Sequence, residues 1–269
     1  MDPLFDTAWT VITVARRDDI VEVALNRPAA RNALDETLMA ELTEAARLLR
    51  LRTDVRAVIL TGTATFFSAG ADLSTRQTRG EAPGLLERRR SVMAGPDLCK
   101  AWEEIEAVTI AAIEGYCLGG GAALVAACDF RIMGAGAYLR LPEVPLGMNM
   151  SWRSIPRLVA LCGPSRTKQM VMFGEAIDAA RSLDWGLADE AVPAGEALAA
   201  ARRWAGKVAA LPPAAVRMTK ESVNAAAMPL ALATSFMDRD QYLLATASED
   251  FREGVRAFRE KRPGRFTGD

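Results

Sequence analysis

Histidine is absent from all 269 residues of this sequence. Without an imidazole, the chain cannot build a Ser-His-Asp or Cys-His catalytic group, a histidine–carboxylate metal site, or a histidine acid or base. Any catalysis must therefore depend on carboxylates, Lys, Tyr, Cys or backbone dipoles.

Other absences narrow the class of protein further. No uninterrupted apolar stretch reaches membrane-spanning length, and the N-terminus lacks the basic start and apolar core of a signal peptide. The net charge of −1 gives no basic excess for nucleic acid. The chain has four cysteines, none in CxxC spacing, which indicates reduced core residues: Cys99, Cys117, Cys128 and Cys162. We therefore expect a cytoplasmic protein with no metal, membrane or nucleic-acid partner.

What is present indicates an α/β fold. Half of the residues are hydrophobic and a quarter are charged, which allows a large buried core. The pattern predicts a hairpin of strands 10–15 and 20–25 around a long turn, helices over 35–51 and 97–106, and strands over 55–62 and 108–113. Such alternation favours parallel strands with helices on the sheet faces.

Strand signals end near Pro193. The remaining sequence predicts helices, which are interrupted at Pro212-Pro213 and at Pro229, and a last helix over 249–261. We expect one large domain whose final third is helical.

Three consecutive glycines stand at the end of an apolar run and before an Ala-rich helical stretch, within residues 114–129. Glycines there let a reacting group approach the backbone, and the free N–H groups of a helix start stabilise a developing oxyanion. A tight strand-to-helix turn with glycines for packing explains the same residues equally well. A phosphate loop is disfavoured because no Lys-Ser/Thr follows and no GxGxxG is completed.

Five segments in this order resemble the crotonase (enoyl-CoA hydratase/isomerase) superfamily: 25–34, 66–73, 115–121, 141–147 and 248–266. The resemblance implies a crotonase-like (ClpP/crotonase) fold of repeated ββα units. It further implies a core over 1–193 with an acyl-CoA site, and a helical oligomerisation region over 194–269 that forms trimers or hexamers. The partner would be an acyl-CoA thioester, with coenzyme A as part of the substrate and no other cofactor.

The resemblance also assigns roles to single residues. The backbone N–H groups of Ala71 and Gly120 would hold the thioester oxygen as an enolate forms. Ala69, Asp72 and Leu73 match positions that line the adenine and pantetheine parts of a CoA site. Tyr242, Phe258 and Lys261 match a C-terminal helix that closes over CoA, although ordinary helix surface explains each of these three as well. The arginines of residues 74–96 form either a solvated face or a pocket wall that meets phosphates.

One position departs from the hydratase pattern. Hydratases of the superfamily place one glutamate three residues after the second oxyanion glycine and another in the later Pro-Glu motif. This chain has Ala123 at the first position and keeps only Glu143 at the second. Apolar neighbours would raise the pKa of Glu143 toward the operating range of an acid–base catalyst, whereas a salt-bridged glutamate at a strand end is the alternative.

One carboxylate above an oxyanion hole is sufficient to move a proton between C2 and C4 of a 3-enoyl thioester. The spacing from Glu143 to Trp152 resembles single-glutamate isomerases, and no aspartate stands near Ser151 in the sequence to match a dienoyl isomerase. We therefore expect an enoyl-CoA isomerase. An enoyl-CoA hydratase, or a CoA-thioester-binding protein with little turnover, is the alternative.

Overall fold

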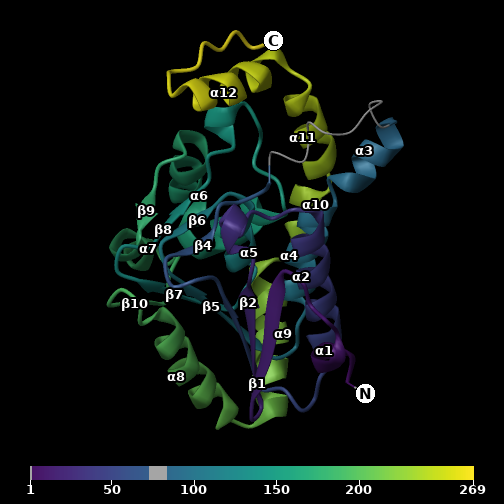
Figure 1. Cartoon of the computed structure of the whole chain (residues 1–269), viewed down its shortest axis with the longest axis vertical. Helices are drawn as coiled ribbons and strands as arrows, with labels where there is room; N and C mark the ends of the chain where they lie inside the picture. Colours follow the sequence, from purple (N-terminus) through teal and green to yellow (C-terminus); the bar gives the residue numbers. More distant parts are fainter. Residues whose placement is uncertain (1, 73–83) are drawn as a thin grey trace.

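The computed structural model describes residues 2–72 and 84–269, and its strands form two sheets (Figure 1). The large sheet has the order β1 (Ile12–Arg17), β2 (Ile20–Leu25), β3 (Ala57–Thr61), β5 (Val108–Ile113), β7 (Phe130–Gly134) and β10 (Glu190–Val192). The small sheet has the order β4 (Phe66–Ser68), β6 (Tyr116–Leu118), β8 (Tyr138–Arg140) and β9 (Ile177–Asp178). From β2 onward the large sheet is parallel, as the alternating pattern predicts.

Helices surround both sheets and make up all regular structure after β10. They are α1 (Pro3–Asp6), η1 (Pro28–Ala30), α2 (Glu36–Leu49), α3 (Leu85–Ser91), α4 (Ala94–Glu103), α5 (Gly120–Ala126), η3 (Val144–Leu146), α6 (Ser154–Phe173), α7 (Ala179–Trp185), α8 (Ala197–Ala209), α9 (Pro213–Ala227), α10 (Ala231–Ser235), α11 (Asp238–Thr246) and α12 (Glu249–Glu260). In the described parts of the chain, no helix is both long and apolar enough to cross a membrane.

The hairpin differs from the expected one. Arg17 pairs with Ile20, so the turn contains only Asp18 and Asp19, and Asp18 adopts a φ of 57°. Aspartate tolerates this left-handed conformation, which two-residue hairpin turns require. The expectation of a long turn was wrong because the last polar residues of β1 belong to an edge strand whose side chains reach solvent.

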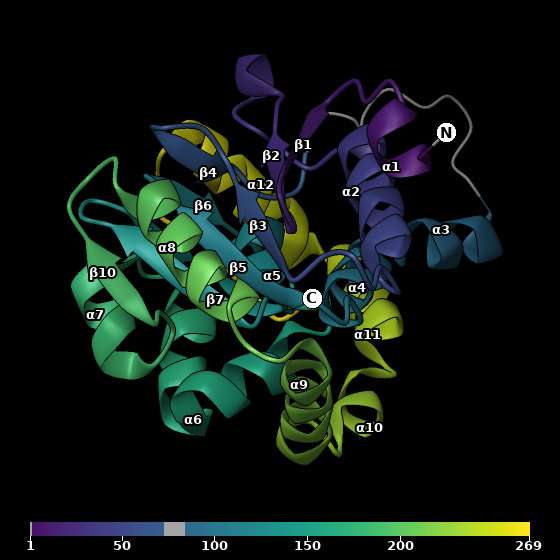
Figure 2. The same cartoon turned by 90° about the horizontal axis from the view of Figure 1, so that it is seen from below.

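Both faces of the large sheet are buried, which explains why its central strands are continuous apolar runs. Val58, Leu60 and Ala111 face a core shared with α2, α4 and α5. Ile59 and Ile110 face four small residues of α8: Ala197, Ala200, Ala201 and Ala205. Figure 2 shows α8 lying across the strands of this sheet.

From β3 to β8, consecutive strands alternate between the two sheets. β3, β5 and β7 enter the large sheet, and β4, β6 and β8, which follow each of them, pair with one another in the small sheet. This repetition brings the chain that follows β4, β6 and β8 to one place, because the three strands are parallel neighbours.

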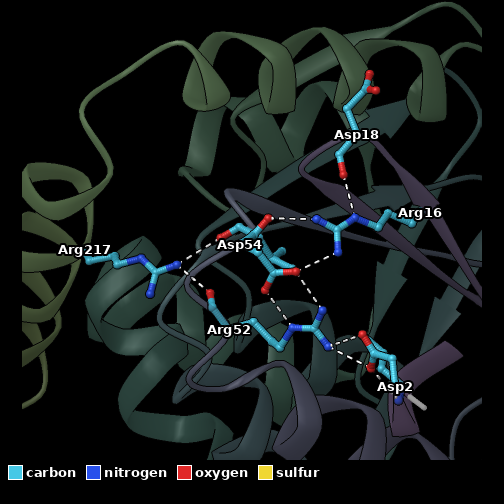
Figure 3. A network of polar contacts seen from close by, with 8 residues as sticks. Asp2, Arg16, Asp18, Arg52, Asp54 and Arg217 are labelled. Atoms are coloured by element: carbon cyan, nitrogen blue, oxygen red, sulfur yellow. Dashed lines mark hydrogen bonds and ion pairs between the residues drawn. The ribbon is translucent and has the colours of Figure 1, made fainter.

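A polar network joins the N-terminus to the rest of the molecule (Figure 3). Arg52 binds the carboxylates of Asp2 and Asp54, and Arg16 binds Asp54 from β1 at 2.6 Å. Arg217 of α9 donates to the Arg52 carbonyl at 2.6 Å. The Arg52 guanidinium holds the pKa of Asp54 well below its usual range.

We expect Arg52→Ala to lower the free energy of unfolding by about 1 kcal/mol, because exposed ion pairs contribute little singly and more in networks. Chemical denaturation at low and high salt measures the effect, which should shrink as salt screens the charges. Arg50→Ala is the matched control, since Arg50 makes one ion pair at 3.8 Å. Equal losses in the two variants would contradict the role of the network.

Candidate active site

Gly119 joins the small sheet to α5. Its φ of 48° and ψ of −119° lie in a region that only glycine adopts readily. Its N–H donates to the Arg140 carbonyl at 2.8 Å, and its carbonyl accepts from the Ala123 N–H at 3.0 Å. The helix that begins at Gly120 is buried along all seven residues, so its first-turn N–H groups lie inside the protein rather than in solvent.

The loop after β4 lies against this glycine. A Cβ built on Gly70 would be 3.6 Å from the Gly119 Cα, so the two backbones approach as closely as glycines allow. Ala71 forms a parallel bridge with Leu34, in which the Gly70 carbonyl and the Asp72 N–H bond to Leu34. The Ala71 N–H therefore points away from Leu34, because successive peptide groups of an extended chain alternate in direction.

Asn32 fixes the position of this loop. It is fully buried with a φ of 51°, its Oδ1 accepts from the Arg27 N–H at 2.9 Å, and its Nδ2 donates to the Phe67 carbonyl at 3.0 Å. Ser68 Oγ donates to the Asn32 carbonyl and accepts from the Gly70 N–H. The segment from Leu25 to Leu34 therefore serves as a support for Ala71.

Glu143 reaches the same glycine from the third segment, just before η3. A Cβ on Gly119 would lie 2.8 Å from Glu143 Oε1, so the carboxyl occupies the space that a side chain would take. Glu143 Oε2 is buried and has no hydrogen-bond partner among the described residues. Burial raises the pKa of Glu143 to about 7, which suits a group that must both accept and release a proton near neutrality.

The structure thus brings Ala71, Gly120 and Glu143 together around Gly119, as the expected roles require. A polarisable oxygen placed between the two N–H groups would have a titratable carboxyl beside it. Ala123 lies one turn into α5 and is 1% exposed. Because its side chain is a methyl group, this position presents no carboxylate. The arrangement is suited to removing and returning a proton next to a carbonyl.

The other site residues lie at different distances from this centre. Ala69 is in the same loop, and Asp72 binds Arg27 at 2.8 Å, so its carboxylate is engaged within the protein. Leu73 lies outside the described residues. Tyr242 is half-buried on α11, whereas Phe258 is 62% exposed on α12 and Lys261 is exposed at its end. The roles of these residues in binding CoA stay predictions.

The helix α12 nevertheless contacts the turn that carries Glu143. A Cβ on Gly254 would meet the Leu146 carbonyl carbon at 2.6 Å, and one on Gly147 would meet the Phe251 Cα at 2.7 Å. Backbone therefore packs on backbone, and α12 supports η3 directly.

Comparison with known proteins assigns the family. The sequence model described as enoyl-CoA hydratase/isomerase matches residues 15–269. The chain belongs to the enoyl-CoA hydratase/isomerase family. Among the relatives of this family, the 2,3-dehydroadipyl-CoA hydratase of Escherichia coli K12 is 32% identical over 257 residues, which are 96% of this chain and 98% of that protein.

Solved structures of enoyl-CoA hydratases agree in fold. One from Bacillus anthracis has a TM-score of 0.76 at 32% identity and covers 97% of this chain and 100% of its own. One from Mycobacterium avium subsp. paratuberculosis has a TM-score of 0.85 at 24% identity, with coverages of 96% and 99%. The crotonase fold is therefore confirmed, and the family acts on acyl-CoA thioesters.

Two contacts near the candidate site were not predicted from the sequence. Asp238 of α11 accepts from the Arg153 N–H at 3.0 Å, so an aspartate does lie close in space to the segment after Ser151. Trp152 lies against the Gly120 Cα. The tryptophan was visible as part of a pattern, but nothing local in the sequence indicated its contact or the approach of Asp238.

We expect Asn32→Ala to lower the free energy of unfolding by about 2–3 kcal/mol, because it leaves the buried Phe67 carbonyl without its donor. Urea denaturation measures the loss. Asn26→Ala, in the same segment at an exposed position, is the control. A loss no larger than the control's would show that Asn32 does not hold the loop.

Glu143→Gln should make the protein more stable above pH 7. The raised pKa means that the folded state binds a proton which the unfolded state releases, so wild-type stability falls as pH rises from about 4.5 to about 7. Above that window the variant should gain up to about 3 kcal/mol relative to wild type, and the difference should vanish at low pH. Denaturation across pH tests this, with exposed Glu221→Gln as control. A pH-independent difference would contradict the raised pKa.

Proposed function

We propose that this chain isomerises the double bond of an enoyl-CoA thioester, with Glu143 carrying the proton. The observation that supports this most is a single buried carboxyl, with a pKa of about 7, at the glycine that opens α5. Ala123 leaves the neighbouring position of the helix without an acid.

The reaction needs only groups of this chain. The Glu143 carboxylate removes a proton from C2 of a 3-enoyl thioester, and the electron pair passes to the thioester oxygen. The N–H groups of Ala71 and Gly120 stabilise that oxygen as it becomes negative. Glu143 then returns the proton to C4, which gives the conjugated 2-enoyl thioester. No water is consumed, and coenzyme A enters as part of the substrate, so we expect no separate cofactor.

Hydration of a 2-enoyl thioester is the second candidate, because the relatives named above are hydratases. It adds a hydroxyl to C3 and a proton to C2. Glu143 would have to orient the water and handle the proton alone, since Ala123 cannot share either task. We therefore rank hydration below isomerisation.

We also retain the expectation that residues 194–269 mediate assembly into trimers or hexamers. Helix α9 has no buried residue and exposes Met218 and Val223, although α8 packs on the large sheet. A cavity of about 650 Å³ with many apolar lining residues lies under α9, toward the end of α5 away from Gly120. The three cations that line it are all paired: Lys220 with Asp129 at 2.6 Å, Arg157 with Glu103 and Arg131 with Asp189, which favours a packing surface over a catalytic one. Sedimentation at several concentrations measures the oligomeric state.

We expect Glu143→Gln to lower kcat for isomerisation by at least about 10³-fold, because the amide keeps the shape of the side chain but cannot act as a base. Affinity for a saturated acyl-CoA should persist, and Glu143→Asp should retain part of the activity.

The assay follows absorbance of the conjugated enoyl thioester. Its appearance from trans-3-hexenoyl-CoA reports isomerisation, and its loss from trans-2-hexenoyl-CoA reports hydration. Near-normal turnover of Glu143→Gln would remove Glu143 from the mechanism. Inertness of the wild type with both substrates, together with acyl-CoA binding, would favour a binding protein.

A further inference from the structure

The indole of Trp152 lies between two glycines on different helices. A Cβ on Gly95 of α4 would come within 2.5 Å of Trp152 Cδ2, and a Cβ on Gly120 of α5 within 2.5 Å of Cη2. Neither position can carry a side chain while the indole is there. The ring therefore rests on the backbone of the residue whose N–H is proposed to hold the substrate oxygen.

The backbone is held in an unfavourable conformation to place this ring. Trp152 and Arg153 have φ values of 63° and 55°, a left-handed pair that costs non-glycine residues about 1–2 kcal/mol each. Buried Asp238 accepts from the Arg153 N–H at 3.0 Å. Arg157, 4% exposed, donates to the Arg153 carbonyl at 2.8 Å and binds Glu103 of α4 at 2.7 Å. These contacts tie the turn at Trp152 and Arg153 to the helices α4, α6 and α11.

The ring also lies over the face of α5 that carries Ala123. Residues three apart share a helix face, and side chains lean toward the turn that precedes them. A side chain at residue 123 would therefore extend over Gly120, into the volume of the Trp152 indole. Ala123 is 1% exposed, which is consistent with a neighbour that covers it.

We propose that Trp152 is a specificity-determining residue: its indole covers the face of α5 that carries Gly120 and Ala123 and keeps water from the acyl group. This inference rests on the proposed isomerisation. Transfer of a proton between C2 and C4 adds nothing to the substrate, whereas hydration forms a C3–O bond and needs a water near C3. A site closed to water at that point retains proton transfer through Glu143 and suppresses addition.

Four variants of the whole 269-residue chain test the proposal: Trp152→Ala, Trp152→Phe, Ala123→Glu and Ala123→Glu/Trp152→Ala. Trp185→Phe is the control, because Trp185 lies on α7 with the Arg181 guanidinium over its ring and is not among the atoms nearest to Gly95 or Gly120. Hydration of trans-2-hexenoyl-CoA and isomerisation of trans-3-hexenoyl-CoA are measured for each variant that folds.

Trp152→Ala should raise the ratio of hydration to isomerisation by at least about tenfold, which corresponds to about 1.4 kcal/mol between the two transition states. Trp152→Phe should change the ratio less, and Trp185→Phe should not change it. Ala123→Glu should hydrate no faster than wild type because the indole blocks its carboxylate, whereas the double variant should hydrate faster than either single variant.

A readout other than turnover tests the location of the ring. Hexanoyl-CoA, which cannot react, should change the tryptophan fluorescence of wild type and Trp185→Phe, and should change that of Trp152→Phe much less. An equal change in all three proteins would place Trp152 away from the acyl group and overturn the proposal.

The kinetic outcomes separate two failures. A folded Trp152→Ala variant that isomerises with an unchanged ratio overturns the role of Trp152 and leaves the proposed function intact. A wild type that does not isomerise overturns the proposed function. In that case the role of Trp152 in excluding water is tested by hydration alone. Trp152→Ala must then hydrate faster than wild type, and an equal or lower rate overturns that role. If Ala123→Glu does not fold, the two Trp152 variants decide the matter.

Discussion

Three segments of the chain meet at the Cα of Gly119, and the candidate site depends on the missing side chain there. Gly70 approaches from the loop after β4, and Glu143 places its Oε1 where a Cβ would be. The φ of 48° at Gly119 also turns the chain from β6 into α5 and directs the first N–H groups of the helix inward. Any larger residue would displace the carboxyl, the helix start or the loop.

The large sheet provides the stability that such a site requires. Glu143 Oε2 is buried with no hydrogen-bond partner in the part of the chain that the structure describes, and Trp152 and Arg153 beside it are held at positive φ. Both features cost free energy, and they persist only where the surrounding structure fixes them. Close packing on both faces of the large sheet, by α2, α4 and α5 on one side and α8 on the other, is that surrounding structure.

The sequence contained enough to predict the parallel sheet, because its central strands are apolar runs separated by helical periods. The glycines from 119 to 121 predicted a tight strand-to-helix turn at the start of α5, because that requirement is local, but they fitted a packing turn and a backbone site equally well. The short hairpin turn was missed because Arg16 and Arg17 look like loop residues on an edge strand. The approach of Asp238 to Arg153, separated by 85 residues, leaves no periodic signal and could not be predicted. The resemblance to a family contributed the role of Glu143, which its own neighbours left ambiguous.

The contact between α12 and η3 has a consequence for the order of events during biosynthesis. The turn that begins at Glu143 is supported through Gly147 and Gly254, and Gly254 follows the last strand, β10, in the chain. The strands of both sheets have all emerged once β10 has been synthesised, whereas the support for Glu143 is completed only after α12 has followed. The two sheets can therefore form before the proposed acid–base group is fully supported.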